Sequence, residues 1–336
     1  MHTGQNYDRE LYGVFFEDLG LRAPDFRLDA AGANAADTAG RILCAIDPVL
    51  ARVRPDAFLV LGDTNSCLAA IAAKKRHVPV FHMEAGNRCF DQRVPEECNR
   101  RIVDHLADVN LCYSDIAREY LLREGLPPDF VIKTGSPMFE VLSAQLPKVR
   151  RSRIRAALGL RRGKYFVVSA HREENVADAR HFAALCSALD LVAAEFGLPV
   201  VVSAHPRTRK AIEREGVKFN PLVRLMKPMG LTDYLSLQMG AKAVLSDSGT
   251  ISEESNILGF PALNLREAHE RPEAMEEAAV MMTGLNPERI LQGLAQLGKC
   301  GPSRPVADYR APDVGAKVVR IILSHVDYVR RKVWCE

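Results

Sequence analysis

The feature that most constrains this chain is a repeated order of apolar run, turn and helical segment, which begins at about residue 56. Runs such as 78–81, 109–112 and 131–132 are apolar almost throughout, which is typical of parallel strands with both faces of the sheet covered by helices. No apolar run approaches the roughly 18 residues that a membrane-spanning helix needs. The pattern therefore predicts an α/β protein built on parallel sheets, with no membrane partner.

The same alternation divides the chain. A length of 336 residues corresponds to about two domains. The alternation stops after Pro147 at a basic segment, 148–155, and restarts with predicted strands at 165–168, 200–202, 243–245 and 262–265. We interpret the basic segment as a solvated linker and helix start rather than an anion site. We expect two doubly wound, Rossmann-like domains, 1–147 and 148–312, that face a ligand cleft, and a helix within 313–336 that packs back on the first domain.

Charge and cysteine content narrow the class of protein. Forty-five basic and forty-two acidic residues are interspersed and give a net charge of +3, which argues against a nucleic-acid partner. The eight cysteines form no C-x-x-C pair and lie mostly in apolar or helical stretches, as buried free thiols do. The first residues lack the basic and apolar segments of a signal peptide. We expect a cytoplasmic protein without a zinc or other metal site.

Two carboxylates follow predicted strands in the first half. The strand at 57–61 ends in Gly62-Asp63-Thr64, where Asp63 or Thr64 either caps the next helix or takes part in chemistry. The strand at 78–81 leads into Glu84, and no clear helix start follows it there. Glu84 is therefore the stronger candidate for a functional carboxylate.

A third candidate carboxylate opens a helix. Pro95 precedes Glu96 and Glu97, and an apolar stripe at Ile102, Val103 and Leu106 predicts that a helix follows. Glutamates in a first helical turn also complement the helix dipole. A structural and a chemical role for these two side chains are therefore equally compatible with the sequence.

Polar clusters follow two strands of the second half. The strand at 165–168 leads to His171 and Arg172, which suit an acid or a cation facing an anionic leaving group. The strand at 243–245 leads through Asp247 to Ser248-Gly249-Thr250 and a helix, an order that favours phosphate binding by backbone N–H groups. Neither G-x-G-x-x-G nor G-x-x-x-x-G-K-[ST] occurs, so a dinucleotide cofactor and nucleotide hydrolysis lose their main support.

Taken together and in order, the motifs resemble a known family, the non-hydrolysing UDP-N-acetylglucosamine 2-epimerases, whose fold is of the glycosyltransferase-B type. The resemblance covers essentially the whole chain and rests on these segments: His2-Thr-Gly-Gln5, Gly62-Asp-Thr64, His82-Met-Glu-Ala-Gly86, Pro95-Glu-Glu97 with Asn99-Arg100, His171-Arg172 with Glu174-Asn175, Asp247-Ser-Gly249 with Glu253-Glu254, and Glu270-Arg-Pro-Glu273.

The resemblance implies a reaction and a role for each matched residue. UDP is eliminated to give a 2-acetamidoglycal and then returns with a proton on the opposite face, with no cofactor. Asp63, Glu84 and Glu96 would be the acid/base groups, and His171 would be catalytic or face the phosphates. Ser248, Gly249 and Thr250 would hold the diphosphate, Glu254 the ribose hydroxyls, and Arg271 the anionic or sugar portion. The expected partners are a UDP-N-acetyl amino sugar and a second copy in a homodimer.

Two departures from the common family pattern point to a narrower group. Glu173 replaces a second Arg after His-Arg, and Thr250 replaces a second Gly after Asp-Ser-Gly. They look like the enzymes that convert UDP-2-acetamido-2,6-dideoxy-L-talose to UDP-N-acetyl-L-fucosamine for surface polysaccharides such as capsule or O-antigen. UDP-N-acetylglucosamine/UDP-N-acetylmannosamine epimerisation is the alternative. A glycosyltransferase of the same fold and an inactive, truncated sugar-nucleotide-binding protein are more distant ones.

The start of the chain also departs from the family. Relatives begin with a strand, a Gly-Thr-Arg-Pro-Glu turn and a helix before His-Thr-Gly-Gln, whereas this chain opens at Met1-His2. We expect that one strand-helix unit, on the order of 30 residues, is missing.

Overall fold

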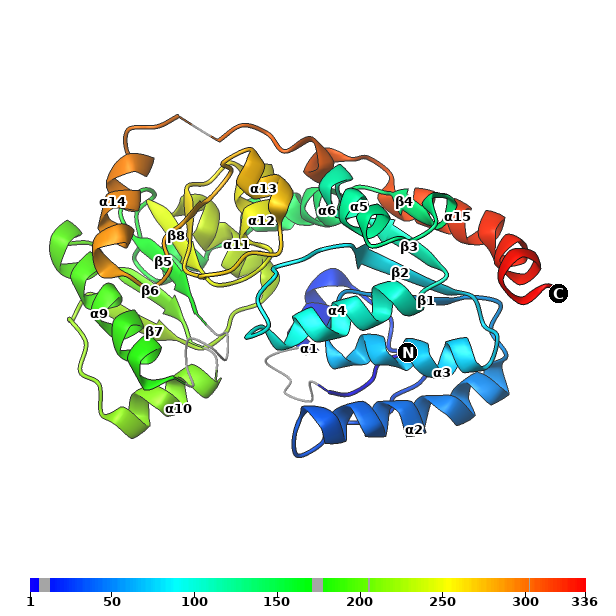
Figure 1. Cartoon of the computed structure of the whole chain (residues 1–336). Coiled ribbons are helices and arrows are strands. Elements are labelled where there is room, and N and C mark those ends of the chain that lie inside the picture. Colours follow the sequence, from blue (N-terminus) through cyan, green and yellow to red (C-terminus); the bar gives the residue numbers. More distant parts are fainter. Residues whose placement is uncertain (6–12, 171–177, 205, 302) are drawn as a thin grey trace. The chain divides into compact units, whose positions relative to one another are not determined.

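The chain folds into two compact α/β units. The computed structural model describes residues 1–5, 13–170, 178–204, 206–301 and 303–336. Unit 1 comprises Met1–Phe16, Gly20–Glu140 and Ala307–Glu336, and unit 2 comprises Glu17–Leu19 and Val141–Val306. Each unit is built on a parallel sheet covered by helices (Figure 1), so the predicted fold class is confirmed.

Unit 1 contains a sheet of four described strands in the order β1-β2-β3-β4. These are β1 (Phe58–Leu61), β2 (Val80–Ala85), β3 (Val109–Cys112) and β4 (Val131–Lys133). All four residues of β3 are buried, as expected for a strand covered on both faces. β1 lies at the end of this order, and its outward-facing Leu59 and Leu61 are 45% and 59% exposed. The helices between residues 13 and 130 are α1 (Gly13–Leu19), α2 (Ala35–Val53), α3 (Ala70–Lys75), α4 (Pro95–Leu106) and α5 (Asp115–Arg123), and the short turns are η1 (Asn65–Ala69) and η2 (Pro128–Phe130).

The last helix of the chain belongs to unit 1. α15 (Val314–Val329) covers the residues whose apolar spacing predicted a helix, and it buries Val314, Val318 and Ile321 in one cluster with Phe81 and Leu111 of the sheet. Short turns precede and follow it, η3 (Ala307–Arg310) and η4 (Arg330–Trp334). The C-terminal segment thus contributes to the core of unit 1 although it is far away in sequence.

Unit 2 has a six-stranded parallel sheet in the order β10-β9-β8-β5-β6-β7. Its strands are β5 (Phe166–Ser169), β6 (Val200–Ser203), β7 (Val223–Met226), β8 (Ala243–Ser246), β9 (Ala262–Asn264) and β10 (Met281–Met282). The chain runs outward from β5 to β7, returns to β8 beside β5, and then runs outward in the other direction. The topological switch point, where doubly wound sheets bind ligands, therefore lies between β5 and β8.

The helices of unit 2 agree with the predicted alternation, with one correction. They are α6 (Met138–Arg151), α7 (Ile154–Ala157), α9 (Ala179–Phe196), α10 (Pro206–Glu215), α11 (Leu231–Gly240), α12 (Ile251–Leu258), α13 (Pro272–Glu276) and α14 (Pro287–Leu297). The basic segment 148–155 is mostly helical rather than a linker, because α6 starts before Pro147 and continues through it to Arg151; the predicted helix start within the segment is α7, which begins at Ile154. The positive charges at the last turn of α6 complement the helix dipole.

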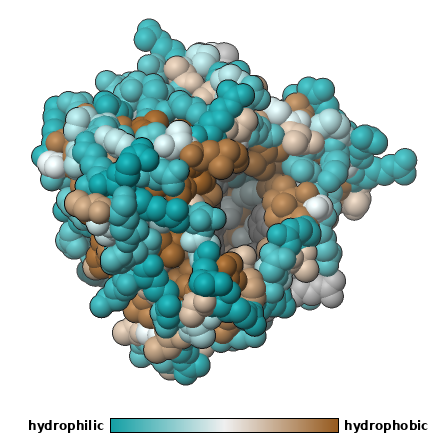
Figure 2. Space-filling view, turned by 90° about the vertical axis from the view of Figure 1, so that its right-hand side faces the viewer, coloured by the Kyte–Doolittle hydropathy of each residue, from teal (hydrophilic) through white to brown (hydrophobic). Residues whose placement is uncertain are grey.

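Exposed large apolar side chains occur in both units, among them Leu59 and Leu61 of unit 1 and Leu225 and Met282 of unit 2. Figure 2 shows hydrophobic residues gathered around a hollowed part of the face that it presents. None of the helices that the structure describes is long and apolar enough to cross a bilayer.

Candidate active site

The predicted carboxylates of unit 1 lie where two neighbouring parallel strands end. β1 and β2 pair in parallel, with Leu61 opposite Met83, so the Gly62-Asp63 turn and Glu84 emerge at the same edge of the sheet. The Gly62 amide donates to the Met83 carbonyl oxygen at 3.0 Å, which holds this turn against β2. Asp63 and Glu84 are thus brought together as expected from their positions after strands.

Glu84 has an unusual backbone conformation. Its φ of +68° lies in the left-handed region, and the register of β2 against β3 shifts between Met83 and Ala85. The residue is therefore a β-bulge, a device that redirects one side chain out of the strand. Asn87 Nδ2 donates to Glu84 Oε1 at 3.4 Å, and a methyl group on Gly62 would lie 3.5 Å from Glu84 Oε2. The bulge directs the Glu84 carboxylate at the turn that carries Asp63.

Asp63 forms an ion pair with an arginine of α4. Its Oδ2 accepts from Arg100 Nη2 at 2.6 Å and Nε at 3.0 Å, and Arg100 is buried in α4. Thr64 occupies the N-cap position of η1 without a side-chain capping hydrogen bond. Capping by the Thr64 side chain is therefore not observed, and the Asp63 carboxylate makes a charge-assisted contact with the Arg100 guanidinium.

The two glutamates at the start of α4 differ in their surroundings. Glu97 is buried and accepts from Arg100, Arg101 and the backbone of Cys89 at 3.0–3.2 Å. Burial acts to raise the pKa of Glu97, but the hydrogen bonds from Cys89 and the charge of Arg100 hold that pKa below its usual value. Glu96 is only partly buried. Glu97 therefore has a structural role, and Glu96 keeps access to solvent or ligand.

The buried face of α4 carries charged side chains beside the predicted apolar stripe, of which Val103 is buried and Leu106 packs against the same core. Ile102 is 41% exposed, whereas the buried residues are Glu97, Arg100, Val103 and Asp104. Hydrophobic periodicity therefore predicted Val103 and Leu106 correctly, but it predicted neither the exposure of Ile102 nor the ion-paired charges that share the buried face.

A buried network beneath β2 was not predicted from the sequence. Asp104 accepts from His82 Nδ1 at 2.8 Å, from Arg88 Nη1 at 2.6 Å and from the Gly86 amide at 3.2 Å. His82 Nε2 contacts the Gly62 carbonyl oxygen at 3.0 Å, and Arg88 also binds Glu124 through two hydrogen bonds. The only sequence feature that could have indicated this network is the helical spacing of ionisable residues in 95–106, which follow the His82–Gly86 motif in the chain.

In unit 2 the predicted phosphate-binding turn follows β8 at the switch point. Ser248, Gly249 and Thr250 connect β8 to the N-terminus of α12. The turn is partly satisfied internally, since the Ser248 amide donates to Ser246 Oγ at 3.1 Å and the Thr250 amide to Ser248 Oγ at 3.3 Å. The expected cradle of free backbone N–H groups is therefore only partly open, and the Ser248 and Thr250 hydroxyls, 2.9 Å apart, are the polar groups beside it.

Glu254 is held one helical turn after this loop. Its Oε1 accepts from Thr250 Oγ1 at 2.7 Å and its Oε2 from Gln238 Nε2 at 2.9 Å. Burial raises the pKa of the Glu254 carboxyl, against the effect of these two hydrogen bonds. Gln238 and its neighbour Tyr234, on α11, were not among the predicted site residues. Tyr234 bonds to Ser169 and Gln238, and burial raises its pKa.

The remaining predicted residues lie around the same edge of unit 2 or outside the described residues. Arg271 Nε donates to Glu253 Oε2 at 3.2 Å, and both side chains are buried, so the loop before α13 is joined to the first turn of α12. His171 lies outside the described residues, as does Glu173. Among the residues that the structure describes, no group of three or more His, Cys, Asp or Glu side chains is arranged to hold a metal ion.

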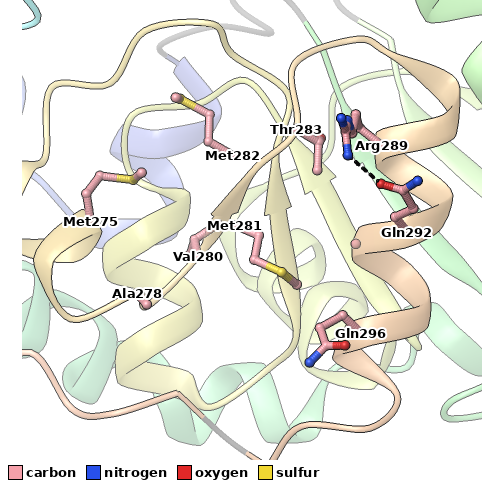
Figure 3. Close-up of a pocket in the computed structure, with 10 residues that line it drawn as sticks. Met275, Ala278, Val280, Met281, Met282, Thr283, Arg289, Gln292 and Gln296 are labelled. Carbon is pink, nitrogen blue, oxygen red and sulfur yellow. Dashed lines mark hydrogen bonds between the residues drawn. The ribbon is translucent and has the colours of Figure 1, made fainter.

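A separate cavity of about 730 Å³ lies at the β10 edge of unit 2 (Figure 3). Met281 points toward α14, where Arg289 donates to Gln292 Oε1 at 2.8 Å. The residues that line it, which include Met275 and Gln296, contain none of the predicted site residues. This cavity is therefore distinct from the edge where the candidate site lies.

Comparison with known proteins shows which family this chain is similar to. The family model described as UDP-N-acetylglucosamine 2-epimerase matches residues 1–323. The UDP-2,3-diacetamido-2,3-dideoxy-D-glucuronate 2-epimerase of Pseudomonas aeruginosa is 34% identical over 306 residues, which cover 89% of this chain and 84% of that protein.

Solved structures are similar along nearly the whole chain. The UDP-N-acetylglucosamine 2-epimerase of Rickettsia bellii is 45% identical with a TM-score of 0.91, covering 100% of this chain and 91% of that one. The Methanocaldococcus jannaschii UDP-GlcNAc 2-epimerase in complex with UDP-GlcNAc and UDP is 30% identical with a TM-score of 0.90, covering 96% and 91%. The two parallel-sheet domains are those of the glycosyltransferase-B type. The chain belongs to the UDP-N-acetylglucosamine 2-epimerase family, whose members are isomerases.

Proposed function

We propose that this chain inverts C2 of a UDP-2-acetamido sugar by eliminating UDP and adding it back. The observation that carries this proposal is the Glu84 bulge, which directs a carboxylate at the Asp63 turn. A β-bulge with a left-handed glutamate costs on the order of 1–3 kcal/mol in strain, and such strain is concentrated at functional sites. Membership of the epimerase family supports the same chemistry.

The reaction needs groups that move a proton at C2 while the bond from C1 to the diphosphate breaks. A carboxylate removes the C2 proton, the electron pair forms the C1–C2 double bond, and UDP leaves with the C1–O electrons. A proton then returns to C2 on the opposite face while UDP adds back to C1 on its original face, so only C2 is inverted and no redox cofactor is consumed. Asp63, Glu84 and Glu96 are the acid/base groups of this proposal, and His171 acts at the phosphates or as a further acid.

The nucleotide end of the substrate is assigned to unit 2. Ser248, Gly249 and Thr250 receive the diphosphate at the start of α12, and Glu254 accepts hydrogen bonds from the ribose hydroxyls. Arg271 serves the anionic or sugar portion. The position of the turn at the β5–β8 switch point supports this assignment, and the Methanocaldococcus jannaschii relative was solved with UDP-GlcNAc and UDP.

Deuterium incorporation tests the function. In heavy water, turnover should place deuterium at C2 of the UDP-sugar, which proton NMR detects. Glu84→Gln should lose at least about 100-fold in turnover while UDP binding stays near that of the wild type. Glu119→Gln, on the exposed Glu119–Arg123 pair, is the matched control and should behave as the wild type. Product that retains its original C2 proton would eliminate the mechanism, and a fully active Glu84→Gln would eliminate the assigned base.

The substrate that we propose is UDP-2-acetamido-2,6-dideoxy-L-talose, which is converted to UDP-N-acetyl-L-fucosamine for surface polysaccharides. Thr250, one of the two departures from the general pattern, supports a site with its own specificity, because its hydroxyl is a direct hydrogen-bond donor to Glu254. The second candidate is UDP-N-acetylglucosamine, favoured by 45% identity to the Rickettsia bellii protein. We expect a higher kcat/KM for the L-talose sugar; an equal or higher value for UDP-N-acetylglucosamine would select the second candidate.

We further propose that the enzyme acts in the cytoplasm as a homodimer. The eight cysteines are free, which supports a reducing compartment. Light scattering of the purified chain should give twice the 37.2 kDa mass of one copy, and a monomer at micromolar concentration would contradict the dimer.

A further inference from the structure

One polar side chain near the candidate nucleotide site of unit 2 has no assigned role. The loop after β9 leads from Asn264 to Arg271 and lies beside the loop after β8, since β8 and β9 are neighbours in the sheet. His269 belongs to this loop, and its ring atom Nδ1 is shielded from solvent without a hydrogen-bond partner. A polar atom in that state costs free energy unless a ligand or a water completes it.

The surroundings of His269 are ordered by charged side chains. Arg266 Nη2 donates to Glu270 Oε1 at 2.8 Å, and both side chains are more than nine-tenths buried. The Arg266 amide donates to Asn264 Oδ1 at 2.9 Å, which fixes the start of the loop. Burial, assisted by the charge of Arg266, lowers the pKa of His269, so its ring is neutral at physiological pH and carries one donor and one acceptor nitrogen.

The position of the loop relative to α12 indicates which part of a UDP-sugar it would meet. Consecutive glutamates of α12 point to different neighbours: Glu254 to Gln238 of α11, and Glu253 to Arg271 of the loop. A UDP-sugar is a linear chain of uracil, ribose, diphosphate and hexose. With the ribose at Glu254, on the side of α11, and the diphosphate at the start of α12, the hexose lies beyond the diphosphate on the side away from the ribose, where the loop after β9 lies.

We propose that His269 is a specificity-determining residue whose Nδ1 forms one hydrogen bond with the hexose of the bound UDP-sugar. The proposal rests on the proposed function for the orientation of the nucleotide. It assigns the loop after β9 to the sugar and the loop after β8 to the diphosphate. A hydrogen bond to this ring would increase the affinity for a UDP-sugar whose hexose has a polar group within reach of Nδ1.

The test uses two substitutions at His269, each of which puts a polar side-chain atom near the position of one of the two ring nitrogens. Asn places a polar atom near the position of Nδ1, and Gln places one near Nε2, whereas Ala removes both. Affinities for UDP, UDP-N-acetylglucosamine and UDP-2-acetamido-2,6-dideoxy-L-talose would be measured by calorimetry. His269→Ala should weaken the tighter-binding UDP-sugar by about 5- to 10-fold, the effect of one neutral hydrogen bond, and leave UDP unchanged. His269→Asn should recover most of the loss, and His269→Gln should not.

Each other outcome overturns the inference. Equal weakening of UDP and UDP-sugar would assign His269 to the nucleotide, and an unchanged His269→Ala would show that it touches neither. If the wild type bound the UDP-sugar no more tightly than UDP, the hexose would make no favourable contact with the protein, and the proposed hydrogen bond to His269 would be refuted. An unchanged melting temperature of each variant shows that the loop is intact. Because only binding is measured, a wild type that binds as expected but does not epimerise contradicts the proposed function and leaves this inference standing.

Discussion

Replacing Asp104 by Asn tests whether the buried network beneath β2 holds unit 1 together. The carboxylate is fully buried and accepts from His82, Arg88 and the Gly86 amide. Removing one partner of a buried ion pair costs about 3–5 kcal/mol, because the other charge remains buried. Arg88 keeps its two hydrogen bonds to Glu124, so we expect the lower end, about 3 kcal/mol of the free energy of unfolding.

The chain offers a local probe for this measurement. Trp334 is the only tryptophan, and it packs against the core of unit 1, where its ring stacks on His77 with centroids 5.2 Å apart. Urea unfolding followed by tryptophan fluorescence therefore reports unit 1 rather than the whole chain. With an m-value of about 2 kcal/mol per molar urea, Asp104→Asn should lower the midpoint by about 1.5 M.

A surface pair in the same unit provides the control. Asp25 pairs with Arg22 at 2.6 Å, and both side chains are more than half exposed. Asp25→Asn should leave the midpoint unchanged, since exposed ion pairs contribute little. A shift of less than about 0.3 M for Asp104→Asn, in a protein with an unchanged m-value, would refute the importance of the network.

Two further predictions concern unit 1. Gly86→Ala should destabilise unit 1 strongly, because Gly86 has a φ of +82° and an added methyl would lie 2.2 Å from the Ala117 carbonyl oxygen. Gly159→Ala in unit 2 is the control, since Gly159 also has a positive φ, +65°, but an added methyl there would meet open space, so this variant shows the backbone effect alone. A melting temperature of Gly86→Ala as high as that of Gly159→Ala would contradict the predicted clash. Glu97 has a lowered folded-state pKa, so its stabilising contribution is complete above its unfolded pKa of about 4.5 and is lost as the pH falls through the folded value. As the pH is lowered below about 4.5, the urea midpoint measured by Trp334 fluorescence should therefore decrease, and it should decrease less steeply for Glu97→Gln than for the wild type. Parallel curves of midpoint against pH for the two proteins would refute a stabilising role of the Glu97 carboxylate.

The sequence predicted the strands whose residues are all apolar, and it missed a strand that contains a charged residue and a very short one. The predicted strands at 57–61, 165–168 and 243–245 correspond to β1, β5 and β8. β7 and β10 went unpredicted, since β7 contains the exposed residues Arg224 and Leu225, and β10 has two residues. Apolar periodicity reports burial by hydrophobic contact, so it detects the apolar β1 even at the end of its sheet and has no signal for a strand with exposed or charged residues.

The candidate site shows the same limit more sharply. Asp63 and Glu84 could be placed together because each follows a strand of one parallel sheet. The pairing of Asp63 with Arg100, and the burial of Asp104, could not, because ionisable residues on a helix are normally read as solvent-facing. Their burial depends on partners from other elements, which single-sequence patterns do not specify.

The buried charges explain how a strained glutamate is kept in place. His82 lies two residues before Glu84 and Gly86 two residues after it, and both bind Asp104. The backbone on either side of Glu84 is therefore fixed, and the extra residue of the bulge has to be accommodated between the two anchors. The left-handed conformation costs about 1–3 kcal/mol, and disrupting the buried pair costs about 3–5 kcal/mol. Relaxing Glu84 by releasing Asp104 is thus the more expensive change, and the carboxylate stays directed at the turn that carries Asp63.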